Sequence, residues 1–87
     1  MKLLTINDFK QRVLFHLLDY DVRDWATCFA VDQDGSVVVF RALPIANPDF
    51  GQWDVKEGDG REPYSHTEMG SVPIPEEINW KDCLWSL

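Results

Sequence analysis

The sequence contains no long hydrophobic run and only two cysteines, and these gaps exclude several classes of protein. No apolar stretch approaches the roughly eighteen residues that are needed to cross a bilayer. The first residues, Met1 to Leu4, lead into a polar, amphipathic segment that does not resemble a signal peptide. We therefore expect a cytoplasmic protein in which Cys28 and Cys83 are reduced and buried, although a bridge between them stays open.

Lysine and arginine are also scarce. The chain has 8 Lys and Arg residues against 15 Asp and Glu residues, which gives a net charge of −7. Nucleic-acid backbones and anionic membrane surfaces both attract positive side chains, so we expect neither as a direct partner. The excess of acid suits a partner protein with a basic surface, but it can equally serve only to keep a small protein soluble.

What the chain does contain is apolar and aromatic material for one folded domain. Its 87 residues are 45% hydrophobic and include four tryptophans and five phenylalanines. A domain of this size buries only about 60–65% of its unfolded surface, so nearly every large apolar side chain is needed in the core. We predict a single domain that spans residues 1–87.

Residues 5–20 predict an N-terminal helix. Thr5 can cap it, and Asp8 stands three residues later in the capping-box position. The helical period then gathers on one side Ile6, Phe9, Val13, Leu14, Leu17, Leu18 and Tyr20. Phe15 falls among the polar positions instead, so either a later segment covers it or it is exposed.

A β-hairpin is expected after the helix. Its strands are Trp25–Val31 and Ser36–Arg41, and the turn Asp32–Gly35 offers a glycine for a positive φ.

The two faces of the first expected strand differ in size. Trp25 and Phe29 lie on one face, and small side chains lie on the other. Because small residues let a helix approach closely, we expect the N-terminal helix on the face of Ala26, Cys28 and Ala30. The face with Trp25 and Phe29 then needs a second cover, or it is exposed and functional.

The middle of the chain predicts shorter elements. Leu43–Gln52 is typical of an irregular loop, because it contains two prolines and a glycine. Trp53–Val55 predicts a short third strand, and Lys56–Pro63 predicts a turn-rich loop. Tyr64–Val72 predicts a fourth strand that Gly70 interrupts.

The C-terminal segment predicts one helical turn. Asn79 can cap it, and Trp80 and Leu84 are neighbours on its surface that can cover the second sheet face or Phe15. We therefore predict an α+β fold, with the N-terminal helix packed on a three- to four-stranded antiparallel sheet. A short C-terminal helical turn closes the other face or an edge of that sheet.

Residues 25–87 also resemble a module of small uncharacterised phage and prophage proteins. Trp25–Gly35 match a "WAT..A.D.DG" hairpin, and Ile78–Leu84 are similar to a "DW..SL" segment. Between these two motifs, Phe40–Pro44 and Trp53 also carry the resemblance. Asn79 replaces the usual acid of the second motif, and Cys83 replaces the usual serine. The resemblance implies a phage-type accessory protein in the cytoplasm of a host cell, and it transfers no catalytic residue.

No motif for catalysis, metal binding or phosphate binding is complete. The turn Asp32–Gly35 lacks the further acids of a calcium loop, and Gly58–Gly60 is flanked by acids that repel phosphate. Histidines, cysteines and acids occur without a spacing that joins them into a catalytic group. We expect no enzyme, no metal site and no cofactor, with a hydrolase built on His66 and Cys83 or an acid as a weaker alternative.

The favoured hypothesis is that acidic loops bind a basic surface of a host protein and inhibit or redirect that protein. The residues proposed for this contact are Asp19, Asp21, Asp24, Asp32, Asp34, Glu57, Asp59 and Glu62. An alternative is a pocket for a nucleotide-like or anionic ligand, which combines aromatic faces with arginine. Its residues would be Arg41, Phe50, Trp53, Arg61 and Tyr64.

A further alternative is a structural or dimerising protein. In that case Phe15, or the face of Trp25 and Phe29, would be buried between two copies of the chain.

Overall fold

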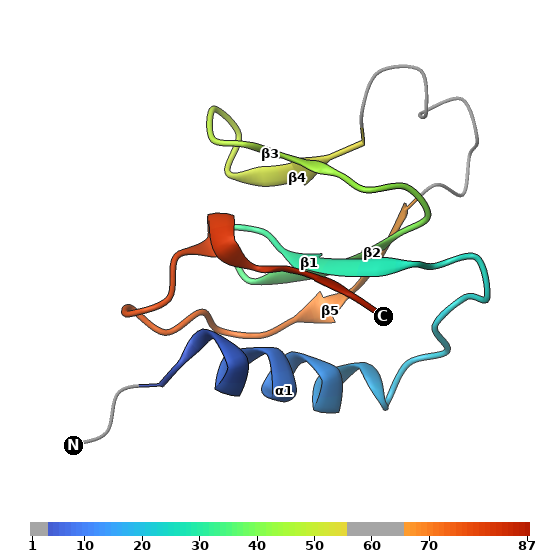
Figure 1. Cartoon of the computed structure of the whole chain (residues 1–87), viewed down its shortest axis with the longest axis horizontal. Helices are drawn as coiled ribbons and strands as arrows, with labels where there is room; N and C mark the ends of the chain where they lie inside the picture. Colours follow the sequence, from blue (N-terminus) through green and yellow to red (C-terminus); the bar gives the residue numbers. More distant parts are fainter. Residues whose placement is uncertain (1–3, 56–65) are drawn as a thin grey trace.

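The computed structural model describes residues 4–55 and 66–87 of the chain. In chain order its elements are α1 (Ile6–Leu17), β1 (Cys28–Val31), β2 (Ser36–Phe40), β3 (Ile45–Asn47), β4 (Gln52–Asp54), β5 (His66–Ser71), the 3-10 turn η1 (Trp80–Asp82) and β6 (Leu84–Ser86). The predicted α+β fold is therefore confirmed (Figure 1). The predicted loop Lys56–Pro63 lies outside the described residues.

Four strands form one antiparallel sheet in the order β5-β2-β1-β6. The predicted hairpin joins β1 to β2, and Gly35 in its turn has a φ of 93°. A Cβ atom at position 35 would meet the backbone carbonyl of Val72, so this turn requires glycine. Strand β5 pairs with β2 and confirms the predicted fourth strand, with Gly70 at a φ of 70° inside it.

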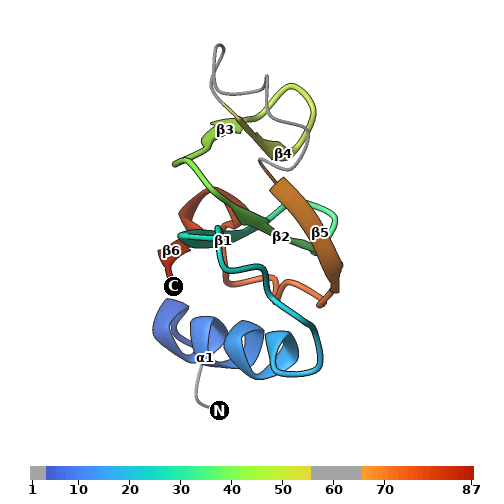
Figure 2. The ribbon, with the colours of Figure 1, turned by 90° about the vertical axis from the view of Figure 1, so that its right-hand side faces the viewer.

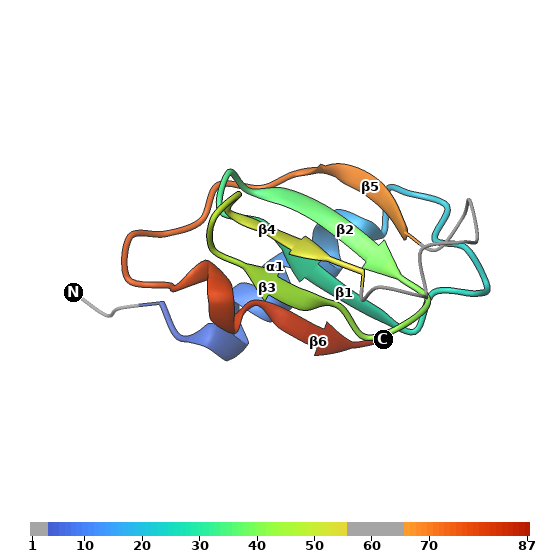
Figure 3. The same cartoon turned by 90° about the horizontal axis from the view of Figure 1, so that it is seen from above.

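The described residues form three layers. Figure 2 shows α1 below the four-stranded sheet and the small β3–β4 sheet above it. Figure 3 shows the same β3–β4 hairpin lying over β1 and β2. Each face of the large sheet therefore has its own cover, and we call these two sides the helix face and the hairpin face.

Helix α1 is fixed by the predicted cap. The Thr5 side chain accepts a hydrogen bond from the Asp8 amide at 3.1 Å, and the Asp8 carboxylate accepts one from the Thr5 amide at 3.2 Å. Of the predicted apolar side, the fully buried part is Phe9, Val13 and Leu17. These side chains pack on the helix face of the sheet against Phe29, Val31, Val37, Val39 and Met69.

The helix covers the opposite face from the one that we expected. The helix face carries the large side chains of β1, whereas Cys28 and Ala30 point to the hairpin face. The physical reason is the size of the other cover, because Trp53 and Trp80 both lie on the hairpin face. Two indole rings need the space that small side chains leave, and their centroids are 6.1 Å apart at 84°.

Two short strands in the middle of the chain differ from the prediction. The segment Leu43–Gln52 was predicted to be irregular, but Ile45–Asn47 forms β3 and pairs with β4. The predicted third strand at Trp53–Val55 begins one residue earlier and belongs to this second sheet instead of the main one.

The C-terminal segment forms both a turn and a strand. Asn79 caps the predicted helical turn, accepting a hydrogen bond from the Lys81 amide at 3.0 Å. Trp80 and Leu84 then cover the sheet face opposite the helix, as predicted, but this face carries Cys28 and Ala30 and not Phe29. Phe15 stays exposed. Strand β6 was missed, and it places Trp85 in the core 5.2 Å from the Phe29 ring centroid.

Candidate functional site

Two turns that are distant in the sequence are joined by hydrogen bonds. The Gln33 amide donates to the Gly51 carbonyl at 2.8 Å, and the Trp53 amide donates to the Asp32 carboxylate at 2.8 Å. The Trp53 indole Nε1 donates to the Val31 carbonyl at 3.0 Å. These bonds hold the β3–β4 hairpin against the turn between β1 and β2, so side chains from both turns form one surface.

That surface and the adjoining strand β5 together carry four carboxylates, which we call the acidic face: Asp32, Asp34, Asp54 and Glu68. Asp32, Asp54 and Glu68 line one hollow of about 310 Å³ beside Trp53, Val38 and His66. Asp34 lines an adjoining hollow of about 290 Å³ that shares Asp32. Glu68 points to the hairpin face because its partner in the neighbouring strand is Val38.

Neutral donors orient three of these carboxylates. Asp32 accepts from the Trp53 amide, and Asp34 accepts from the Ser36 amide at 2.9 Å. Asp54 accepts from the side-chain amides of Asn47 and Gln52, both at 2.7 Å. Amide donors fix a carboxylate without cancelling its charge, so the acidic face keeps its negative potential.

The carboxylates also act on one another. Desolvation raises the pKa of Asp32, the Trp53 amide lowers it, and the charges of Asp34, Glu68 and Asp54 raise it further. Hydrogen bonds from Ser36 lower the pKa of the exposed Asp34. All three charges that act on Asp32 are negative, so the ionised form of Asp32 is in unfavourable electrostatic surroundings.

An exposed aromatic ring borders the acidic face. Phe50 precedes Gly51 in the β3–β4 turn, and 75% of its surface is exposed. It lines the smaller hollow together with Asp32 and Asp34. Gly51 has a φ of 64°, and a Cβ atom there would meet the Gln33 side chain, so the backbone that presents Phe50 is tightly fixed.

The acidic residues proposed from the sequence do not form a single group. Asp19, Asp21 and Asp24 are exposed on the segment between α1 and β1, at the end of the sheet away from the turn that carries Asp32 and Asp34 (Figure 1). Glu57, Asp59 and Glu62 lie outside the described residues.

Sequence reasoning missed Asp54 and Glu68. The available signal was the alternation of side chains between the two faces of a strand. Asp54 follows a strand tryptophan, and Glu68 stands two positions after His66.

The residues proposed for a ligand pocket are also separated. Trp53 is 9% exposed and packs in the hairpin-face core, whereas Phe50 is on the surface. The Arg41 guanidinium carbon lies 5.7 Å from the Trp25 ring centroid. Arg61 and Tyr64 lie outside the described residues.

His66 and Cys83 are not brought together. Cys83 is fully buried among the side chains of the helix face, while His66 stacks on Phe40 with a centroid distance of 5.9 Å. Burial and the charge of Asp82 raise the pKa of the Cys83 thiol to about 12, so it is not a thiolate near neutral pH. His66 does line the hollow that contains Asp54 and Glu68.

Both cysteines are free and buried in the structure, Cys28 on the hairpin face and Cys83 on the helix face. Within 4–55 and 66–87, no three His, Cys, Asp or Glu side chains are arranged so that they could hold a metal ion. The one α-helix of these ranges is too short to cross a membrane.

Comparisons with known proteins give no relative. No family model, no curated protein and no solved structure matches the chain.

Proposed function

We propose that the protein is a non-enzymatic accessory protein of phage type that binds a basic surface of a host protein and inhibits or redirects it. The acidic face, with Phe50 at its border, is the proposed contact. The observation that carries the proposal is the set of four neighbouring carboxylates, three of them oriented by neutral amides.

The chemistry of this face suits an arginine or lysine side chain of a partner. Carboxylates accept charge-assisted hydrogen bonds from a guanidinium, and a hollow of about 310 Å³ has room for such a side chain. An exposed phenylalanine beside it supplies the apolar anchor that protein interfaces commonly use. The net charge of −7 adds attraction at longer range and makes association fast and sensitive to salt.

The strained carboxylate of Asp32 supports the same proposal. Its pKa is raised by burial and by three negative neighbours, so the ionised form costs the folded protein stability. A cation from a partner would relieve that cost, and groups held in unfavourable electrostatic surroundings are commonly found at functional sites.

Affinity capture from a bacterial lysate tests the proposal with a matched pair of double variants. Asp34→Asn with Glu68→Gln removes two charges from the acidic face, and Asp19→Asn with Asp21→Asn removes two charges elsewhere. We expect the first pair to weaken capture of the partner by about tenfold at low salt, and the second by less than twofold. Equal losses would show that net charge alone attracts the partner, and no salt-released partner at all would contradict the proposal.

A second candidate, self-association, is favoured by the outer surface of α1. Phe15 and Leu18 are 74% and 77% exposed there, and they are three residues apart on one helix. Burying both side chains between two copies would make a dimer. The mass in solution, by light scattering, decides this candidate, and a monomer at high concentration counts against it.

A further inference from the structure

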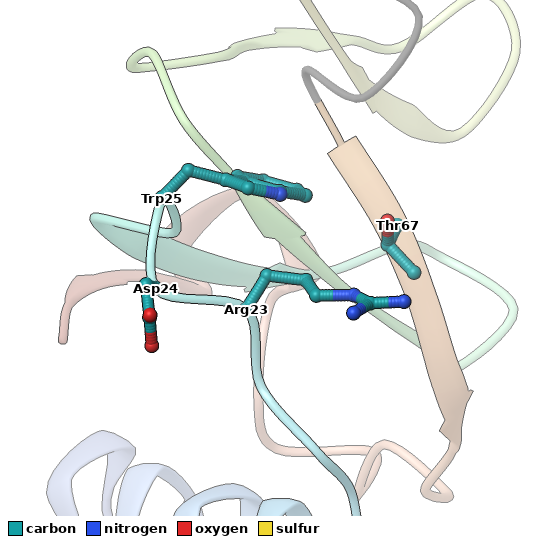
Figure 4. A pocket seen from close by; sticks show the side chains of 4 residues that line it. All are labelled: Arg23, Asp24, Trp25 and Thr67. Carbon is teal, nitrogen blue, oxygen red and sulfur yellow. The ribbon is translucent and has the colours of Figure 1, made fainter.

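Another hollow lies between the segment before β1 and strand β5, and unlike the hollows of the acidic face it is lined by an arginine. It measures about 590 Å³, and the described residues that line it are Arg23, Asp24, Trp25 and Thr67 (Figure 4). Small-molecule sites typically have volumes of about 300–1,000 Å³ and combine an apolar wall with a few polar groups. This hollow contains both kinds of group.

The apolar wall is the indole ring of Trp25, and its position is fixed. The ring packs against the helix-face core, and Arg41 lies over it. The loop that carries it is closed by a hydrogen bond of 3.0 Å from the Ala26 amide to the Arg23 carbonyl. A ring held in this way offers a stacking surface that does not have to be ordered when a ligand binds.

The polar groups are the guanidinium of Arg23 and the hydroxyl of Thr67. Figure 4 shows the Arg23 side chain extending below the Trp25 ring toward Thr67, with the Asp24 carboxylate pointing away. Among the residues that the structure describes, no side chain forms an ion pair or hydrogen bond with the Arg23 guanidinium.

We propose that this hollow binds a small ligand in which a planar ring carries one oxyanion group, either a phosphate or a carboxylate. The ring would stack on Trp25, and the oxyanion would accept hydrogen bonds from the Arg23 guanidinium and the Thr67 hydroxyl. Thr67 is the one described residue that this hollow shares with the hollows of the acidic face. The ligand is an anion, so the inference goes beyond the proposed binding of a basic partner.

Isothermal titration calorimetry with four probes tests the inference. AMP and indole-3-acetate have both the ring and the oxyanion, adenosine has only the ring, and inorganic phosphate has only the anion. We expect AMP, indole-3-acetate or both to bind with a Kd between about 10 µM and 1 mM. Adenosine and phosphate should bind at least tenfold more weakly, because each has only one of the two groups.

Matched arginine variants locate the binding. Arg23→Ala should weaken the binding of the preferred probe at least tenfold, and Arg23→Lys should have a smaller effect because it keeps the charge but loses the planar donor pair. Arg12→Ala removes the same charge from the exposed surface of α1 and should change the Kd by less than twofold. Both arginines are exposed, so all three variants should unfold at the same urea concentration as the parent.

Three results would overturn the inference. One is that neither AMP nor indole-3-acetate saturates the protein at millimolar concentration. Another is that adenosine binds as tightly as AMP and indole-3-acetate, and the third is that Arg12→Ala weakens binding as much as Arg23→Ala. None of these results bears on the acidic face, whose test uses other residues.

Discussion

Replacing Asp32 by asparagine or by alanine separates the two roles of this side chain, as a hydrogen-bond acceptor and as a charge. Asparagine keeps an oxygen that can accept from the Trp53 amide, now bonded at 2.8 Å, and removes the charge. Alanine removes both. We therefore expect Asp32→Asn to increase the free energy of unfolding at pH 7, because its negative neighbours no longer repel a charge there.

The alanine variant should be less stable than the parent. A partly buried amide that loses its acceptor costs about 1–3 kcal/mol. For a domain of this size, each kcal/mol corresponds to about 4–8 °C in Tm. Asp32→Ala should thus lower Tm by at least several degrees, while Asp32→Asn should raise it.

The difference between Asp32→Asn and the parent should depend on pH. Burial is the first cause that raises the pKa of Asp32 above its ordinary value of 3.8. The folded protein therefore binds this proton more tightly than the unfolded chain does. The resulting stability is present below pH 3.8 and is lost as the pH rises through the folded pKa. The advantage of Asp32→Asn should grow over that range.

Urea unfolding followed by tryptophan fluorescence at several pH values measures both effects. Asp34→Asn is a control with the opposite sign, because hydrogen bonds from Ser36 lower the pKa of Asp34. Its charge stabilises the folded state above the ordinary pKa, so that variant should lose stability at neutral pH. If Asp32→Asn and Asp32→Ala were equally destabilising at pH 7, the electrostatic reasoning about the acidic face would be refuted.

Three further predictions follow from the packing. Gly70→Ala should destabilise the fold by about 1–3 kcal/mol in urea unfolding, because a Cβ atom would meet the Tyr20 hydroxyl and the φ of 70° disfavours alanine. Phe9→Ala should cost about 3–5 kcal/mol because Phe9 is fully buried, while Phe15→Ala, at 74% exposure, should change the free energy of unfolding by less than about 0.5 kcal/mol. Native protein at pH 8 should leave Cys83 unmodified by iodoacetamide, and labelling should require denaturant; rapid native labelling located by mass spectrometry would contradict the buried thiol.

The elements that the sequence predicted well have local causes. Thr5 and Asp8 specify the start of α1 by bonding to each other across three residues. Gly35 specifies the β1–β2 turn through a backbone conformation that other residues rarely adopt. Each of these signals needs only a few neighbouring residues, so the sequence contains all that is required.

The parts that were wrong or missed depend on long-range packing. The face that α1 covers is decided by Trp53 and Trp80, which are far from β1 in the sequence and fill the space above Cys28 and Ala30. Strand β6 exists because an edge of β1 is open to it, and residues 84–86 alone give no sign of that.

The candidate site shows the same limit. Asp32 was predicted, but Asp54 joins it only through the contact between the two turns, and Glu68 joins it through the pairing of β5 with β2.

The small β3–β4 sheet gives the protein a way to open locally. Its strands have three residues each, and an isolated two-stranded hairpin is marginally stable in water. Transient detachment would expose the amide and indole hydrogens of Trp53 to exchange with solvent while the large sheet stays intact. A partner that contacted Asp32 and Asp54 at once would hold the hairpin in place and slow that exchange. The rate of hydrogen exchange at Trp53 would therefore report whether the acidic face is occupied.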